Sequence, residues 1–226
     1  MSLIRSNLLD KVNGIQYGFL NRTNSLLIDY YSSGTDLHSI HTLKQIHSDI
    51  VVNVCDLSEN IEKARGDALI SGSKGVNLGV YTADCIPILL ADVNGSAIGI
   101  VHSGWRGTLS SIVEKTIIKL GENFGVVPEN IVSVMGPSIS GDCYEVGTDV
   151  AELFYREFER NNDFLKKSDS DKYLLDLRLA NKYMLMESGV SQVEIIDICT
   201  RCDSDFNSYR GDGKTTGSQM SFIGLV

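Results

Sequence analysis

The sequence predicts an α+β fold in which mixed or antiparallel sheets are flanked by helices. Short β-branched runs bounded by Gly, Asn or Asp recur along the 226 residues, and longer stretches place apolar residues at helical spacing. These strands and helices do not alternate regularly, so a doubly wound parallel sheet is not favoured. The length and the hydrophobic share of 42% suit one globular core, so we expect a single domain over residues 1–226.

The expected strands are the short apolar runs. They cover residues 14–20, 49–55, 67–71, 86–92, 96–102, 130–136 and 193–199. The runs 86–92 and 96–102 are separated only by Val93, Asn94 and Gly95, and an Asn-Gly pair favours a tight turn. We therefore expect these two runs to pair as an antiparallel hairpin.

The expected helices are the stretches with helical periodicity. They run from Thr108 to about residue 123, over 148–160 and over 173–188. Ser111 and Glu114 have the spacing of a capping box near the start of the first helix, and Gly189 follows the third as a C-terminal glycine does. Free N–H groups at the Thr108 end, with Arg106 just ahead, predict a local anion site; the alternative is a capped helix beside a surface arginine.

The overall charge argues against anionic macromolecules as partners. The net charge is −9, from 20 Lys and Arg against 29 Asp and Glu, so we expect no binding to nucleic acid or to anionic membranes. The chain contains no apolar stretch long enough to span a bilayer, and its first residues lack the apolar core of a signal peptide. We therefore expect a cytoplasmic protein. The sequence does not predict its oligomeric state.

The cysteines predict reduced thiols. They are Cys55, Cys85, Cys143, Cys199 and Cys202, an odd number that lies mostly within apolar runs. This pattern fits buried free thiols better than a disulfide framework. The segment "CTRC" at 199–202 lacks the second cysteine pair of a zinc ribbon, so we interpret it as the end of a strand with buried thiols.

The predicted hairpin joins the residues that could carry chemistry. It begins next to Cys85 and ends at His102, and antiparallel pairing brings these two positions together. His47, in a turn that leads into a strand, could complete a set of two imidazoles and one thiolate. Such a set leaves the fourth tetrahedral position of Zn²⁺ open, as in catalytic sites. Two alternatives stay open: packed core residues, and a nucleophilic Cys85 with His102 as base and the 104–107 backbone as oxyanion donors.

Several motifs together resemble the YfiH-type "laccase domain" family, also called the polyphenol oxidase family. They are "KQIHSDIV", "GDALIS", "YTADCIPILLAD", "VHSGWRGT", "MGPSISGDCYEVG", "LDLRLANKYMLMESGV" and "CTRCDSDFNSYRGDGKTTG", in the family's order from about residue 14 to the C-terminus. The resemblance implies a single domain with the CNF1/YfiH-like fold. It also implies a zinc-dependent enzyme that phosphorolyses adenosine, inosine, guanosine and methylthioadenosine and deaminates adenosine, with purine nucleosides and phosphate as its substrates.

The family's metal ligands map onto His47, Cys85 and His102. Zinc would activate water for attack at C6 of adenine, and Asp84 is the neighbouring carboxylate that could transfer protons.

Phosphorolysis needs an anion site, for which we expect Arg106, with Arg65 and Arg210 as weaker candidates. Ser218 stands where the family has an arginine, so the balance of the two activities could differ here.

Other functions remain open at this point. Four histidines cannot supply the copper ligands of a true multicopper laccase, although copper could occupy a site of two histidines and one cysteine adventitiously. The first alternative is a metal-free Cys-His hydrolase that uses Cys85. The second is a non-catalytic protein that binds metal or a partner.

Overall fold

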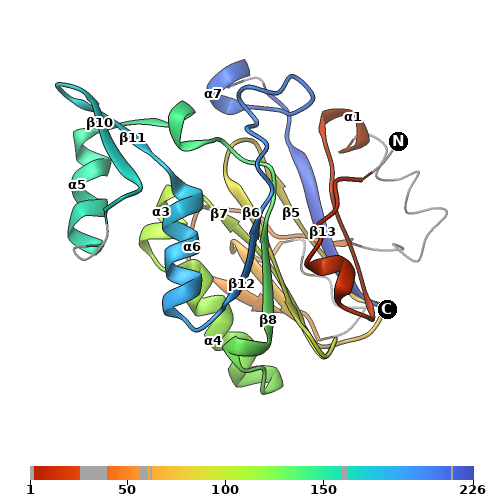
Figure 1. Ribbon diagram of the computed structural model, residues 1–226. Helices are drawn as coiled ribbons and strands as arrows, with labels where there is room; N and C mark the ends of the chain where they lie inside the picture. The colour runs from red at the N-terminus through yellow and green to blue at the C-terminus, as the bar shows by residue number, and fades with distance from the viewer. Residues whose placement is uncertain (1–2, 26–39, 56–60, 62, 159–161, 215) are drawn as a thin grey trace.

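The computed structural model describes residues 3–25, 40–55, 61, 63–158, 162–214 and 216–226 (Figure 1). Its strands are β1 (Ile15–Phe19), β2 (Ile40–His41), β3 (Val51–Asn53), β4 (Ala68–Ser71), β5 (Asn77–Thr82), β6 (Ile86–Asp92), β7 (Ile98–Ser103), β8 (Ile131–Met135), β9 (Glu145–Gly147), β10 (Leu165–Asp169), β11 (Lys172–Leu175), β12 (Gln192–Ile195) and β13 (Gln219–Leu225). Its α-helices are α1 (Arg22–Ser25), α3 (Trp105–Leu109), α4 (Ile112–Phe124), α5 (Thr148–Glu157), α6 (Leu177–Glu187) and α7 (Tyr209–Asp212), and its 3₁₀ helices are η1 (Leu9–Lys11), η2 (Pro128–Asn130) and η3 (Gly141–Cys143).

A mixed sheet buried on both faces forms the centre of the molecule. Its strand order is β12-β8-β6-β7-β4-β3, and β6 pairs antiparallel with both β7 and β8. Along β6, Ile86, Ile88 and Leu90 pack in the cluster that contains α4 and α6, whereas Leu89 and Ala91 pack in the cluster on the opposite face. Because strand side chains alternate between faces, a strand covered on both sides is apolar throughout. This explains the continuous run "IPILLAD".

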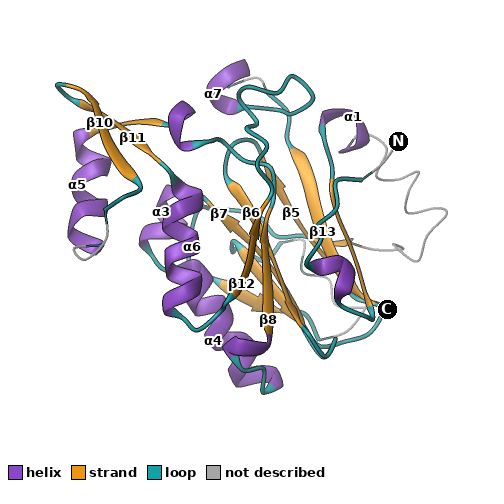
Figure 2. Cartoon of the chain, in the orientation of Figure 1, coloured by secondary structure: helices purple, strands orange, loops and turns teal. Residues whose placement is uncertain are grey.

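The other face of the central sheet is covered by a second sheet, with the order β1-β13-β5-β2. Figure 2 shows this sheet on one side of β6 and β7 and the helices α3, α4 and α6 on the other. β5 and β13 pair antiparallel along their length, and neither was expected from the sequence. The α+β class, with mixed and antiparallel sheets flanked by helices, is confirmed.

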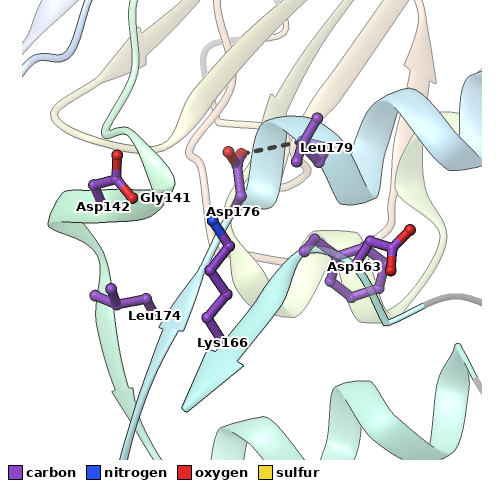
Figure 3. Close-up of a pocket in the computed structure, with 8 residues that line it drawn as sticks. Gly141, Asp142, Asp163, Lys166, Leu174, Asp176 and Leu179 are labelled. Carbon is purple, nitrogen blue, oxygen red and sulfur yellow. Dashed lines mark hydrogen bonds between the residues drawn. The ribbon is translucent and has the colours of Figure 1, made fainter. Parts of the chain in front are cut away.

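The helix expected over 173–188 begins later than its periodicity predicted. Tyr173 lies in β11, which pairs with both β9 and β10 in a small third sheet. Asp176 then caps α6, because its carboxylate accepts hydrogen bonds from the backbone N–H groups of Arg178 and Leu179 (Figure 3). Before Asp176, the pairing of β11 with its neighbouring strands therefore outweighs the helical spacing of the apolar residues. The expected C-terminal glycine, Gly189, does follow α6, with φ of 92°.

The helix expected from Thr108 is divided into two. α3 begins at Trp105 and ends at Leu109, and α4 begins only at Ile112. Between them Ser111 adopts a left-handed conformation, and its side chain makes no capping hydrogen bond, so the predicted capping box with Glu114 is wrong. The expected helix over 148–160 is present as α5, and residues 159–160 lie outside the described part of the chain.

A buried polar network holds α3 against its neighbours. Asn181 of α6 donates to Thr108 Oγ1 at 3.0 Å and accepts from Ser103 Oγ at 2.9 Å, while Thr108 Oγ1 donates to the Gly104 carbonyl. Since every member is buried, the network fixes the turn after β7 relative to α6. None of the helices in the described part of the chain has the length and hydropathy needed to span a bilayer.

The prediction of buried cysteines is wrong. β12 ends at Ile195, so Cys199 and Cys202 lie in a turn beyond the strand rather than at its end. Cys202 and Cys55 are exposed, and Cys85, Cys143 and Cys199 are partly buried. Short sequence runs do not reveal this exposure because it is set by how the connecting segments pack.

Candidate metal centre

The β6–β7 hairpin places Cys85 beside His102, as predicted. The register pairs Pro87 with His102 and Ile86 with Ser103, so Cys85 lies one residue beyond the paired region. Gly104 follows at the same end of the hairpin. A Cβ atom there would lie 2.9 Å from Cys85 Sγ and 3.3 Å from His47 Nδ1, so a glycine is needed for this close approach.

His47 approaches the same point from a separate segment. Its backbone has a positive φ of 57°, in the turn before β3. The imidazole rings of His47 and His102 have centroids 4.9 Å apart. One ligand atom from each of His47, Cys85 and His102 lies within 4.8 Å of the others. The structure therefore brings together the three residues expected to bind a metal ion.

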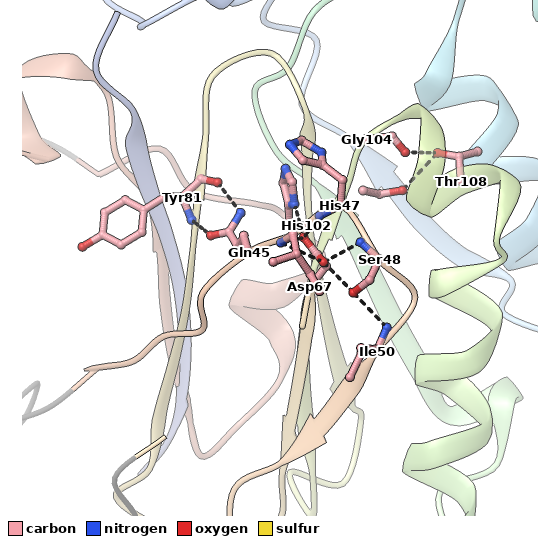
Figure 4. A network of polar contacts seen from close by, with 11 residues as sticks. Gln45, His47, Ser48, Ile50, Asp67, Tyr81, His102, Gly104 and Thr108 are labelled. Carbon is pink, nitrogen blue, oxygen red and sulfur yellow. Dashed lines mark hydrogen bonds and ion pairs between the residues drawn. The ribbon is translucent and has the colours of Figure 1, made fainter. Parts of the chain in front are cut away.

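Asp67 organises this trio, although the sequence analysis did not identify it. The carboxylate is fully buried and accepts hydrogen bonds from His102 Nδ1 at 2.8 Å, from the backbone N–H groups of Ile46, His47 and Ser48, and from the Ser48 hydroxyl (Figure 4). Because a carboxylate only accepts, Nδ1 of His102 carries the proton and Nε2 is left for a ligand. The sequence did contain a signal for Asp67, because a carboxylate directly before a buried strand needs hydrogen-bond donors around its charge.

The charges of the metal-free site are strongly coupled. Burial raises the pKa of Asp67, but hydrogen bonds from His102 and Ser48 outweigh it and hold the pKa well below its usual range. Burial also raises the pKa of Cys85, yet hydrogen bonds from His102 and His47 bring it down to about 6. Burial lowers the pKa of His102, whereas hydrogen bonds to Asp67 and Cys85 raise it to about 9. Near neutral pH, Cys85 is therefore a thiolate beside the His102 imidazolium.

This donor set fits a borderline-soft metal ion. Two imidazoles and one thiolate suit Zn²⁺ or copper, and metal-ligating histidines typically donate their second N–H to a carboxylate, as His102 does here to Asp67. The three donors face a cavity of about 570 Å³, which is within the usual size for small-molecule sites. The identity of the metal does not follow from the donors alone.

Several aromatic and basic side chains also line the cavity. They are Tyr81, Trp105, Arg106, Tyr144, Tyr209 and Arg210. The Arg106 guanidinium lies 4.2 Å from the Trp105 ring centroid, and that of Arg210 lies 4.7 Å from the Tyr144 ring centroid. A guanidinium group is attracted to the face of an aromatic ring, so each ring helps to hold its arginine in place at the cavity. Tyr144, which follows η3, and Tyr209, which begins α7, were not predicted.

The other predicted site residues fall into two groups. Asp84 lines the cavity together with Cys85, because a positive φ of 90° bends the backbone at Asp84, and Ser218 lies there too. Arg65 is exposed, beside Lys44, and is not among the residues that line the cavity. The anion site was expected at a helix start near Thr108, but α3 begins at Trp105 and spans five residues. Arg106 therefore lies within its first turn.

The chain is similar to known proteins in its sequence. Residues 24–226 match the family described as multi-copper polyphenol oxidoreductase laccase. The chain belongs to this family. A purine nucleoside phosphorylase of Clostridium acetobutylicum is 33% identical over 93% of this chain and 87% of its own length. An adenosine deaminase, RL5, from an unknown prokaryotic organism is 34% identical over 85% of this chain and 76% of its own length.

A solved structure supports the same membership. The YfiH protein of Bacillus licheniformis, titled a hypothetical protein, superposes with a TM-score of 0.83 and 26% identity. The match covers 95% of this chain and 94% of that one. The laccase-family fold therefore extends over nearly the whole chain.

The coupled charges of the site predict that the alkylation of Cys85 depends on pH in an unusual way. In metal-free protein, alkylation of Cys85 by iodoacetamide should rise with pH around a midpoint of about 6, because the thiolate is stabilised by His102 and His47. Mass spectrometry of the Cys85 peptide measures this midpoint. His102→Gln should move it upward. A midpoint near the ordinary thiol value of about 8.5 in the unaltered protein would contradict the assigned charges.

Proposed function

We propose that this protein is a zinc-dependent purine nucleoside phosphorylase that also deaminates adenosine. The observation that carries the proposal is the His47, Cys85 and His102 trio at the wall of a cavity lined by aromatic and basic groups. Relatives of similar length are named purine nucleoside phosphorylase and adenosine deaminase, which supports nucleosides as the substrate class. We further propose adenosine, inosine, guanosine and methylthioadenosine as substrates, and phosphate as the second substrate.

We propose that Zn²⁺ is bound by His47, Cys85 and His102. When bound, zinc supplies Lewis acidity, which activates water for deamination. The four histidines of the chain are too few for the copper centres of a multicopper oxidase, so copper in this site would be adventitious and the family's laccase name would not describe the activity. Asp67 keeps His102 in the tautomer that presents Nε2 to the ion.

The rest of the cavity suits a nucleoside and an anion. A purine ring can stack on Trp105, Tyr144 or Tyr209. These side chains offer a large apolar face and lose little conformational entropy when they are ordered. Arg106 and Arg210 supply the positive charge that phosphate needs in a protein of net charge −9. Since Arg65 lies away from the cavity, we omit it from the proposed phosphate site.

We assign Asp84 a positioning role. Its carboxylate accepts from Thr200 Oγ1 and from the backbone N–H of Arg210, both at 2.7 Å. Arg210 in turn donates to the Glu145 carbonyl at 2.7 Å. With both oxygens of Asp84 engaged, it orients the Arg210 segment at the cavity wall. The proton-transfer role that the sequence suggested for Asp84 stays a proposal beside this one.

A metal-free hydrolase is the second candidate function. The observation that favours it is the chain of contacts from Cys85 to His102 to Asp67, in which an acid orients an imidazole beside a thiolate. In this case activity would be abolished by thiol reagents but would survive chelation. The two functions thus differ in their need for metal.

The experiment that tests the proposal incubates metal-quantified protein with adenosine, with and without phosphate. We expect phosphate-dependent adenine and ribose 1-phosphate, or inosine, and a loss of at least about 100-fold on chelation or in Cys85→Ala. Cys55→Ala is the matched control, because Cys55 is exposed and is not among the residues that line the cavity. Stoichiometric zinc with no product from any purine nucleoside would favour a non-catalytic metal-binding protein. Activity that survives metal removal would favour the hydrolase.

Arg106 gives a separate prediction. Arg106→Ala should raise the KM for phosphate by roughly 10- to 100-fold, the cost of losing a hydrogen bond from a charged group. The initial rate of adenine release, measured against phosphate concentration, gives this value. Arg65→Ala, which removes an exposed arginine outside the cavity, should leave it unchanged. Equal phosphate dependence in Arg106→Ala and the unaltered protein would remove Arg106 from the anion site.

We also propose that residues 1–226 act as one laccase-domain unit in the cytoplasm. The acidic charge and the absence of a basic stretch support small molecules, rather than nucleic acid or membranes, as partners.

A further inference from the structure

A second group of metal-ligating side chains lies outside the site described above. The sulfur atoms of Cys143, Cys199 and Cys202 lie within 4.8 Å of one another, and Sγ of Cys143 is 3.2 Å from Sγ of Cys202. Cys143 ends the 3₁₀ helix η3, whereas Cys199 and Cys202 lie in a tight turn after β12. The fold thus gathers three thiols from segments 59 residues apart.

The backbone holds these two segments together without help from the sulfur atoms. Ser138 and Cys199 form a parallel bridge, and the N–H of Thr200 donates to the Ser138 carbonyl at 3.1 Å. Arg201 adds a hydrogen bond from its guanidinium to the Cys143 carbonyl at 3.0 Å. The three thiols are therefore placed by the fold before any ion binds, which lowers the cost of assembling a site.

The surroundings of Cys199 resemble those of a metal-bound thiolate. Ser140 donates two hydrogen bonds to Cys199 Sγ, from its backbone N–H and from its hydroxyl, each at 3.3 Å. Hydrogen-bond donors around a metal-bound sulfur are typical of such sites and tune them.

We propose that Cys143, Cys199 and Cys202 form a second metal site, for a thiophilic ion such as Zn²⁺. Three thiolates select soft or borderline ions, and the exposure of Cys202 leaves a further coordination position open to solvent. A disulfide between Cys143 and Cys202 would use only two of the sulfurs and would leave the two hydrogen bonds from Ser140 to Cys199 Sγ unexplained. The proposal does not depend on nucleoside turnover.

The position of this three-cysteine site gives it a structural role. Cys143 directly precedes Tyr144, which lines the cavity, and Thr200 donates to the carboxylate of Asp84 on the same wall. An ion bound to the three cysteines would tie these two segments together. It would stabilise the cavity wall without touching the substrate.

The test counts the metal ions bound by the 226-residue protein. The protein is stripped of metal by a chelator under reducing conditions, loaded with Zn²⁺, desalted, and analysed for zinc per chain. We expect two zinc ions per chain in the unaltered protein and in Cys55→Ser, and one in Cys143→Ser, in Cys202→Ser and in Cys85→Ala. Cobalt provides a second readout: Cys85→Ala should retain the intense thiolate-to-cobalt charge-transfer absorption, and Cys85→Ala combined with Cys202→Ser should lose it.

The result that overturns the proposal is one zinc ion per chain in the unaltered protein, unaffected by Cys143→Ser and Cys202→Ser. Retention of the full charge-transfer absorption in the double variant would also overturn it. Cys202 is exposed, so Cys202→Ser keeps the test informative if Cys143→Ser fails to fold. A Cys143–Cys202 disulfide in protein isolated without reductant, together with one zinc ion per chain after reduction, would replace the metal site with a redox pair.

Discussion

The buried carboxylate of Asp67 is the interaction on which the site depends. A fully buried charge costs several kcal/mol unless hydrogen bonds compensate it, and here five donor groups do so. Four of these groups belong to the turn at 46–48, and the fifth is the ring of His102. One acid therefore fixes the backbone that carries His47 and the orientation of His102. The separation of the two imidazoles and the tautomer of His102 follow from this arrangement.

The central sheet supplies the rigid support for this arrangement. Asp67 leads into β4, and the N–H of His102 in β7 donates to the Asp67 carbonyl at 2.7 Å. β4 and β7 are neighbours in a sheet covered on both faces, so neither strand can shift without exposing core side chains. The other residues that line the cavity come from the end of β5, from loops and from the short helices α3 and α7. The fold thus combines a candidate metal site supported by the central sheet with a cavity wall built largely from connecting segments.

How much of this structure can be predicted from the sequence depends on how far apart in the sequence the interacting residues lie. The β6–β7 hairpin was predictable because the Asn94-Gly95 turn and the apolar runs are local signals, and it brought Cys85 and His102 together. Asp67 was missed because its partners lie 20 and 35 residues away in sequence. The division of α3 from α4 was missed because the apolar spacing continues through the left-handed Ser111. The cysteine cluster also required the fold, since Cys143 and Cys199 meet only through packing of distant loops.

The most direct test of this account is the zinc affinity of Asp67→Asn, measured by competition with a chelator of known affinity. Asparagine keeps the size of the side chain, but it loses the charge and directs an amide N–H₂ toward backbone donors. We expect affinity at the His47, Cys85 and His102 site to fall by about 10- to 100-fold. Asp92→Asn is the control, because Asp92 is also buried but accepts from Ser96 at the far end of the hairpin. A folded Asp67→Asn protein with unchanged zinc affinity would contradict the account.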